Sequence, residues 1–248
     1  MTPSRGTKPV AASPDVETKE WARVRSWSHS ARSELQSSPS TDGARERNEL
    51  VRRNLAASEG LVAELRQAGV PLEDIGELSN VQLMYPSAAP ILLAHLERPY
   101  PDDIRMAILQ SLQRPYGSVV FERLRDLLKH HAASLPQDVS AGYGHAIAAN
   151  ATKADIPDLV AMIKDPALGM ARLSIALRAA RWRDERVAEA IRQLFREHSL
   201  PWAALRAARL AKLWDLRDEV RPYLNHSTAD FREEARAYFR ALDKAAAK

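Results

Sequence analysis

The chain has no cysteine, only nine glycines and few aromatic residues, which make up 6% of its 248 residues. Without cysteine it has no disulfide, no thiolate metal ligand and no thiol nucleophile of its own. No stretch approaches the roughly 20 apolar residues that cross a bilayer, and the N-terminus lacks the apolar core of a secretory signal. We therefore expect a cytoplasmic protein with no transmembrane segment.

Charge is nearly balanced, because 36 Lys and Arg residues face 32 Asp and Glu residues. Its distribution is uneven, since residues 165–213 hold ten basic and five acidic side chains, a larger excess than the net +4 of the whole chain. Arginine outnumbers lysine 28 to 8. That bias is typical of a GC-rich bacterial coding sequence, so it is weak evidence for a phosphate-binding surface.

Ser, Thr, Pro and Gly dominate residues 1–43, where few aliphatic side chains could stabilise a packed core. This composition predicts a disordered N-terminal tail. Within it, Trp21, Val24 and Leu35 lie near helical spacing, which is compatible with a short amphipathic helix over residues 15–36. Two interpretations stay open. The favoured one places its tryptophans on the protein's own first helices, and the other has the segment fold on a partner or a membrane surface.

From residue 44 onward the apolar residues recur at helical spacing. Residues 44–80 are predicted to form an N-terminal helical cap, and residues 81–248 a series of about five helical hairpins. The first helices of these hairpins end at equivalent positions 32, 35, 32 and 29 residues apart, at Leu96, Leu128, Ile163, Phe195 and Leu224. No run of strand length alternates apolar and polar residues, so we expect an all-α protein.

Three short motifs and four arginines carry a family resemblance: Pro-Ile-Leu-Leu at 90–93, Ile-Pro-Asp-Leu-Val at 156–160, Lys-Asp-Pro at 164–166, and Arg105, Arg172, Arg206 and Arg232. With these features, residues 81–243 resemble the HEAT-repeat family of armadillo-type folds. Residues 68–71, 85–86 and 98–102 further resemble a bacterial group of such proteins. The resemblance implies a right-handed α-solenoid whose arginines pack along the stack and pair with acids of adjacent repeats. It implies a fold without a mechanism.

The common signatures of metal and nucleophilic catalysis are absent from the sequence. None of its seven histidines belongs to a His-Glu dipeptide or a His-x-x-x-His pair. His130 and His131 are adjacent and would point about 100° apart on a helix, which does not suit a shared metal. No Gly-x-Ser-x-Gly elbow is present. We therefore expect no enzyme activity, no metal site and no cofactor.

The strongest constellation combines arginine with tryptophan in the second helices of the third and fourth hairpins. We predict that a protein partner binds this part of the concave face, with six candidate contacts: Arg178, Arg181, Trp182, Arg183, Arg206 and Arg209. The chain would then be a non-enzymatic scaffold or adaptor. The alternative is a DNA-binding HEAT-like protein, because guanidinium and indole groups also suit phosphate contact and base stacking. Alkylpurine DNA glycosylases of HEAT-like fold resemble the chain in composition, although their signature helix does not align.

Overall fold

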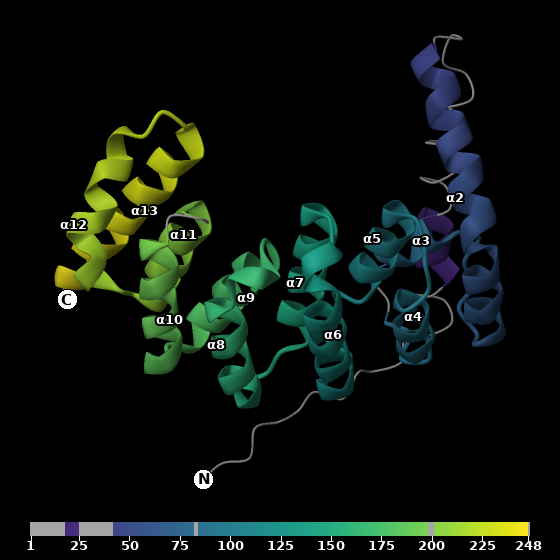
Figure 1. The fold of residues 1–248 in the computed structure, drawn as a ribbon, viewed down its shortest axis with the longest axis horizontal. Coiled ribbons are helices and arrows are strands. Elements are labelled where there is room, and N and C mark those ends of the chain that lie inside the picture. Colours follow the sequence, from purple (N-terminus) through teal and green to yellow (C-terminus); the bar gives the residue numbers. More distant parts are fainter. Residues whose placement is uncertain (1–17, 25–41, 82–83, 198–200, 248) are drawn as a thin grey trace. The chain divides into compact units, whose positions relative to one another are not determined.

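The computed structural model describes residues 18–24, 42–81, 84–197 and 201–247. Every regular element within these ranges is helical (Figure 1). This confirms the predicted all-α class. None of the helices in these ranges is both long enough and apolar enough to cross a membrane.

The chain forms two compact units, Met1–Ser111 and Leu112–Lys248. The predicted boundary between the cap and the hairpin series, at residue 80, lies inside the first unit. The reason is packing: the first predicted hairpin contacts the helices before it, so it joins them in one core. The predicted tail, residues 1–43, is described only at 18–24 and 42–43.

The first unit has a helical segment at 18–24 followed by α2 (Asp42–Gln67), α3 (Ile75–Asn80), α4 (Ala88–Leu96) and α5 (Asp102–Ser111). Helix α2 packs against α3, α4 and α5, and α3 also packs against α5. The core is built from fully buried aliphatic side chains, among them Leu61, Leu65, Leu78, Leu92, Ile108 and Leu109. The turn that follows α2 contains Gly69, whose φ of +86° suits glycine, and in this turn the Val70 N–H donates to the Leu65 carbonyl.

The segment at 18–24 covers part of this core. Trp21 and Val24 are buried, and the Trp21 indole N–H donates to the Tyr85 hydroxyl with the two rings 5.9 Å apart. Trp21 therefore docks on its own unit, as the favoured interpretation predicted. Trp27 and most of the predicted amphipathic helix at 15–36 lie outside the described residues.

The second unit contains four helical hairpins and a series of short 3₁₀ turns. The hairpins are α6 (Ser118–His131) with α7 (Gln137–Asn150), α8 (Ile156–Lys164) with α9 (Ala171–Ala179), α10 (Glu185–Arg196) with α11 (Pro201–Ala211), and α12 (Arg217–Val220) with α13 (Ala229–Ala246). The turns are η1 (Ala132–Ser134), η2 (Lys153–Asp155), η3 (Pro166–Leu168), η4 (Ala180–Trp182), η5 (Trp214–Leu216) and η6 (Arg221–Asn225). With α4 and α5 of the first unit, these helices coincide with the five predicted hairpins.

Within the second unit, each hairpin packs on the next in chain order. The second helices form one series of contacts, α7 with α9, α9 with α11 and α11 with α13. Among the first helices, α8 packs with α10. Each hairpin has an apolar side that its neighbour covers, so the core runs through the whole unit.

Local sequence signals set where the helices begin. Thr152 and Asp155 form a reciprocal capping box before α8, whose first turn also carries Pro157. The Asp184 side chain caps α10 by accepting from the Arg186 N–H at 3.0 Å. These caps satisfy backbone donors that a helix start leaves unpaired.

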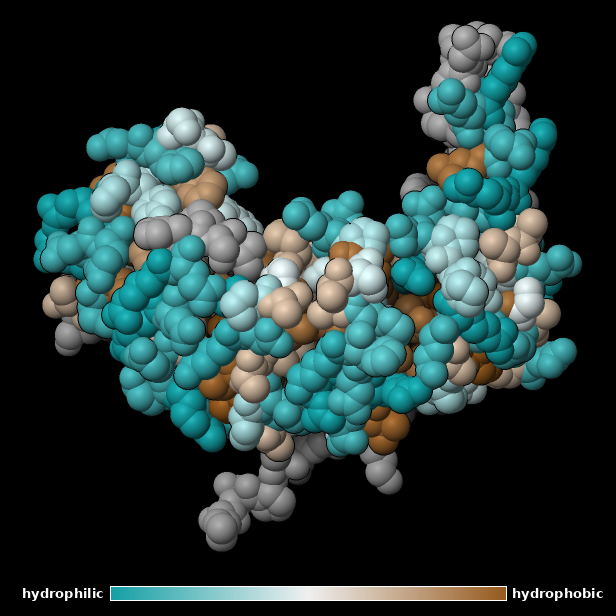
Figure 2. All heavy atoms as spheres, in the orientation of Figure 1, coloured by the Kyte–Doolittle hydropathy of each residue, from teal (hydrophilic) through white to brown (hydrophobic). Residues whose placement is uncertain are grey.

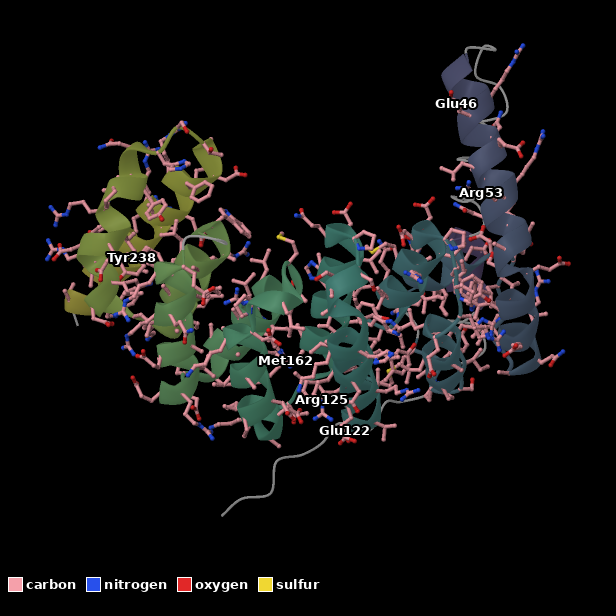
Figure 3. All side chains as sticks on the ribbon, viewed as in Figure 1. Glu46, Arg53, Glu122, Arg125, Met162 and Tyr238 are labelled. Atoms are coloured by element: carbon pink, nitrogen blue, oxygen red, sulfur yellow. The ribbon has the colours of Figure 1, made fainter. Side chains whose placement is uncertain are left out.

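An ion pair joins the first helices of two successive hairpins. Arg125 on α6 donates to the Asp158 carboxylate on α8 at 2.7 Å, and it also contacts Asp126. Figure 3 labels Arg125 and Glu122 close together at the lower edge of the view, below Met162. Met162 of α8 is fully buried, so the pair borders an apolar contact.

Candidate functional site

The predicted site residues lie on α9, on the η4 turn and Arg183 that follow it, and on α11. Helix α9 is held closely against α7. A Cβ added at Gly144 of α7 would lie 2.4 Å from the Ala171 carbonyl oxygen. Ser140 of α7 donates to the Leu168 carbonyl at 2.9 Å and accepts from the Ala171 N–H at 3.2 Å. The start of α9 is therefore fixed by backbone contact, and Gly144 serves the packing of α7 against α9.

One side of α9 leaves apolar side chains half exposed. Met170, Leu173 and Leu177 are each partly accessible, and Arg181 in η4 is exposed. Their spacings of 3, 4 and 4 residues place them on one helix face. Figure 2 shows apolar side chains interrupting the hydrophilic surface over α7 and α9. This face differs from a fully solvated helix face because it mixes aliphatic carbon with a cation.

Two arginine–tryptophan pairs lie on the same two helices. The Arg178 guanidinium carbon lies 5.1 Å from the Trp182 ring centroid, and that of Arg206 lies 5.4 Å from the Trp202 ring centroid. Both tryptophans are half buried. Turn η4, which carries Trp182, packs against α11. The two pairs therefore belong to one surface formed by α9, η4 and α11, which we call the α9–α11 face.

Two other arginines of these helices are committed to ion pairs with neighbouring elements. Arg172 is 2% exposed, donates to the Ile163 carbonyl at 2.7 Å and pairs with Glu197 at 2.6 Å. Arg209 pairs with Glu234 of α13 at 2.7 Å, and the side chains of this pair are 26% and 14% exposed. Arg209, predicted as a partner contact, thus joins α11 to α13.

The remaining predicted arginines have no carboxylate partner among the residues that the structure describes. Arg178 donates to the Ala151 carbonyl at 3.2 Å, and its Nε is buried without an acceptor. Arg181, Arg183 and Arg206 are exposed. Arg183 has a φ of +53°, which is strained for a residue with a side chain. Arg178, Arg181, Trp182 and Arg206 therefore belong to the α9–α11 face, Arg183 follows η4 in sequence, and Arg209 is engaged by Glu234.

The nearby acids pair with arginines of α10. Asp184 accepts from the Arg186 guanidinium at 2.9 and 3.0 Å, and this hydrogen bond lowers the pKa of Asp184 to about 2. Asp215 accepts from Arg192 at 2.8 Å, which lowers the pKa of Asp215 and raises that of Arg192. Acids adjacent in sequence to the α9–α11 face therefore do not neutralise it.

Other side chains with chemical potential do not assemble a reactive centre in the described part of the chain. His145 and Ser174 form a hydrogen bond of 3.1 Å, but in the ranges described no carboxylate orients His145. No group of three or more His, Cys, Asp or Glu residues in these ranges could hold a metal ion. The rings of His130 and His131 meet edge to face.

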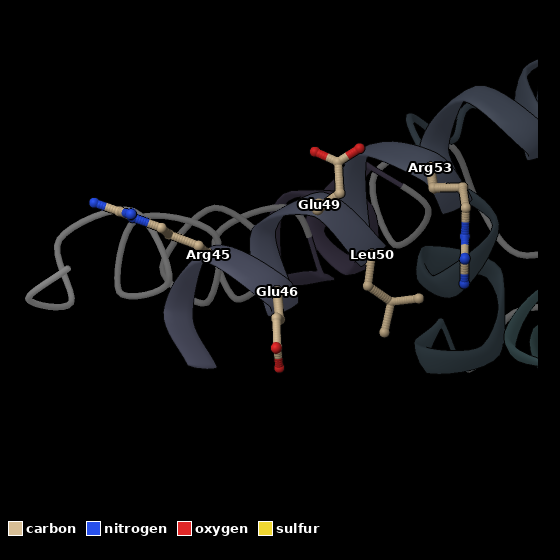
Figure 4. A pocket seen from close by; sticks show the side chains of 5 residues that line it. All are labelled: Arg45, Glu46, Glu49, Leu50 and Arg53. Atoms are coloured by element: carbon tan, nitrogen blue, oxygen red, sulfur yellow. The ribbon is translucent and has the colours of Figure 1, made fainter. Parts of the chain in front are cut away.

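A surface hollow lies on α2. Its described lining is Arg45, Glu46, Glu49, Leu50 and Arg53. Figure 4 shows that these side chains diverge from the helix, with Glu49 on the opposite side from Glu46 and Leu50. Because the polar groups of the described lining all come from α2 and do not converge, they build no binding geometry.

A sequence signal for the α9–α11 face does exist. Residues 175–181 read Ile-Ala-Leu-Arg-Ala-Ala-Arg and residues 203–209 read Ala-Ala-Leu-Arg-Ala-Ala-Arg. This seven-residue repeat puts Arg178 and Arg206 in one position and Arg181 and Arg209 in another. It identifies residues 175–181 and 203–209 as a first and a second copy of one segment, which the spacing of the apolar residues alone did not show.

Comparison of the chain with protein-family models, with curated proteins and with solved structures finds no match.

Proposed function

We propose that the chain is a non-enzymatic protein-binding scaffold that uses the α9–α11 face. Its second unit would be a HEAT-like α-solenoid segment, with second helices on the binding side. Two observations support the HEAT-like interpretation. The second helices contact one another in chain order, and Arg172 of one hairpin pairs with Glu197 of the next. The latter contact is what the family resemblance implies for this arginine.

The observation that carries the proposal is the composition of the α9–α11 face. Half-exposed Leu173 and Leu177 lie on α9, and the η4 turn that follows it presents exposed Arg181. Trp182 and Trp202 are half buried under guanidinium groups. Aromatic and arginine anchors beside aliphatic surface are the composition of protein-binding hot spots. An active site would instead need convergent reactive groups.

Site-specific photocrosslinking in cells that express the protein tests the proposal. A benzophenone amino acid replaces Leu177 on the α9–α11 face, and in a control variant it replaces Ala161, an exposed residue of α8. We expect a discrete protein adduct from position 177 and none from position 161. Adducts with nucleic acid alone, or the same adducts from both positions, would contradict the proposal.

A second candidate function is nucleic-acid binding, favoured by the exposed cations Arg181, Arg183 and Arg206 beside two tryptophans. It predicts binding of a 30-nucleotide DNA that weakens steeply as salt rises. We rank it second because Arg172 and Arg209 of the same helices are already neutralised by carboxylates. No glycosylase step is proposed, since the adjacent carboxylate, Asp184, pairs with Arg186.

A further inference from the structure

We propose that the α9–α11 face recognises an acidic peptide segment that carries aliphatic or aromatic side chains between its carboxylates. This inference rests on the proposed protein-binding function and specifies the chemistry of the partner. It follows from how charge is distributed over the helices of the second unit, from which cations remain unpaired and from how two of them are held.

Acidic residues are absent from the two helices that form the face. Residues 166–183, which cover η3, α9 and η4, contain four arginines and no Asp or Glu. Residues 201–211 of α11 contain two arginines and likewise no acid. By contrast, α10 between them in the chain carries Glu185 and Glu189, which both contact Arg192. Positive charge without acids is therefore a property of α9, η4 and α11, which favours a partner of opposite sign.

The unpaired cations of the α9–α11 face are few. Arg172 and Arg209 are neutralised by Glu197 and Glu234. Arg181 and Arg206 are exposed and have no carboxylate partner among the described residues, and Arg183 and Lys212 share this condition at the ends of their helices. Because η4 packs on α11, the first two belong to one face. A small set of cations suits a few carboxylates.

The contact of Arg206 with Trp202 holds its guanidinium in place for a carboxylate. The guanidinium carbon lies over the indole, 5.4 Å from the ring centroid. No carboxylate of the described residues uses the Arg206 N–H donors, so they can bind a two-oxygen acceptor. Arg178 is held likewise over Trp182, with one nitrogen used by the Ala151 carbonyl. Less side-chain freedom is then lost on binding.

The aliphatic part of the face distinguishes a peptide from a nucleic acid. Met170, Leu173 and Leu177 form a half-exposed stripe that reaches Arg181. Such a stripe can bury apolar side chains of a peptide, whereas a nucleic-acid backbone would set phosphates against it. Proteins that bind nucleic acid through its backbone use about six to ten phosphate contacts. The α9–α11 face lacks that many free cations.

The experiment is a selection from a random 12-residue peptide display library on the immobilised full-length protein in 150 mM salt. Three variants are selected in parallel. R181Q/R206Q removes two cations from the face, R217Q/R240Q removes two exposed cations from α12 and α13, and L177D places a charge in the aliphatic stripe. The first two have the same net charge, so non-specific attraction changes equally in both. Circular dichroism confirms that each variant is folded.

We expect Asp and Glu to be enriched in peptides selected by the wild type and by R217Q/R240Q, and not by R181Q/R206Q. Fluorescence anisotropy of the strongest peptide should then show about tenfold weaker binding to R181Q/R206Q and less than about twofold for R217Q/R240Q. The same peptide with every carboxylate replaced by its amide should lose binding to the wild type.

Three outcomes would overturn the inference, and they separate it from the proposed function. Neutral peptides that depend on Leu177 but not on the arginines would refute the acidic partner and leave the scaffold intact. Peptides whose binding is changed neither by L177D nor by R181Q/R206Q would refute both the acidic partner and the proposed binding function of this face. A 30-nucleotide DNA that binds more tightly than any selected peptide, and that no selected peptide displaces, would assign the face to nucleic acid.

Discussion

The segments 175–181 and 203–209 differ in sequence only at their first residue, yet their last arginines have different environments. Arg209 is half buried and paired with Glu234 of α13, while Arg181 is exposed with no carboxylate partner in the described residues. The reason is the next second helix in the series. Helix α13 supplies an acid to α11, but α11 has no acid to offer α9. A neighbouring helix, and not the local sequence, decides whether the arginine joins two hairpins or is free to bind.

The backbone around the two copies differs as well. Helix α11 runs on to Ala211 and ends with Lys212 at a φ of +61°. Helix α9 ends at Ala179 and tightens into η4, with Arg183 at a φ of +53°. The shorter first copy presents Arg181 and Trp182 in a turn.

The largest expected effect concerns the contact that positions the first copy. In Gly144→Ala the new Cβ would lie 2.4 Å from the Ala171 carbonyl oxygen, and backbone atoms must move. We expect the free energy of unfolding to fall by at least about 2 kcal/mol, measured by urea denaturation. Gly60→Ala in α2 is the control, because its Cβ meets nothing within 4 Å. It should stabilise by about 0.5 to 1 kcal/mol. Equal effects of the two would mean that α7 and α9 are not in close contact.

The next test compares the two arginines directly. Arg209→Gln leaves the Glu234 carboxylate, 14% exposed, without its charged partner, so unfolding free energy should fall by about 1 to 2 kcal/mol. Arg181→Gln should change it by less than about 0.5 kcal/mol, because an exposed side chain loses no ion pair. The same denaturation experiment measures both. If Arg181→Gln destabilised as much as Arg209→Gln, the two copies would have the same structural role.

These contrasts also indicate how far the sequence can be interpreted. Apolar periodicity predicts the helices well, because a helix such as α10, with buried Val187 and Ile191, needs only its own pattern and an Asp184 cap. The pairing of Arg209 could not be predicted, since it depends on α13 approaching from 25 residues away. The division at residue 111 also depends on which helices share a core. The HEAT assignment and the binding face stay predictions.

A smaller effect is expected at the helix ends. Lys212 takes the left-handed position that Gly69 occupies after α2, with the same backbone hydrogen bonds, in which the Leu213 N–H donates to the Ala208 carbonyl. Lys212→Gly should therefore stabilise by about 0.5 to 1 kcal/mol, since a Cβ is strained there. Arg183→Gly should give a similar gain in stability, and the melting temperature measures it in both variants. If Arg183 contacts the acidic peptide, Arg183→Gly should also bind that peptide more weakly. A loss of stability in either variant would show that the side chain has a structural contact.

The smallest effect concerns the acid that follows the first copy. Arg186 lowers the pKa of Asp184 from its ordinary value of 3.8 to about 2, so the ionised carboxylate stabilises the folded chain. This stabilisation is present above the unfolded pKa and is lost as pH falls through the range from about 4 to 2. Asp184→Asn keeps an oxygen to cap α10 but cannot titrate. We therefore expect the melting temperatures of wild type and variant to converge between pH 5 and pH 2. A difference independent of pH would mean that Asp184 is not held by Arg186, and it could then neutralise Arg183.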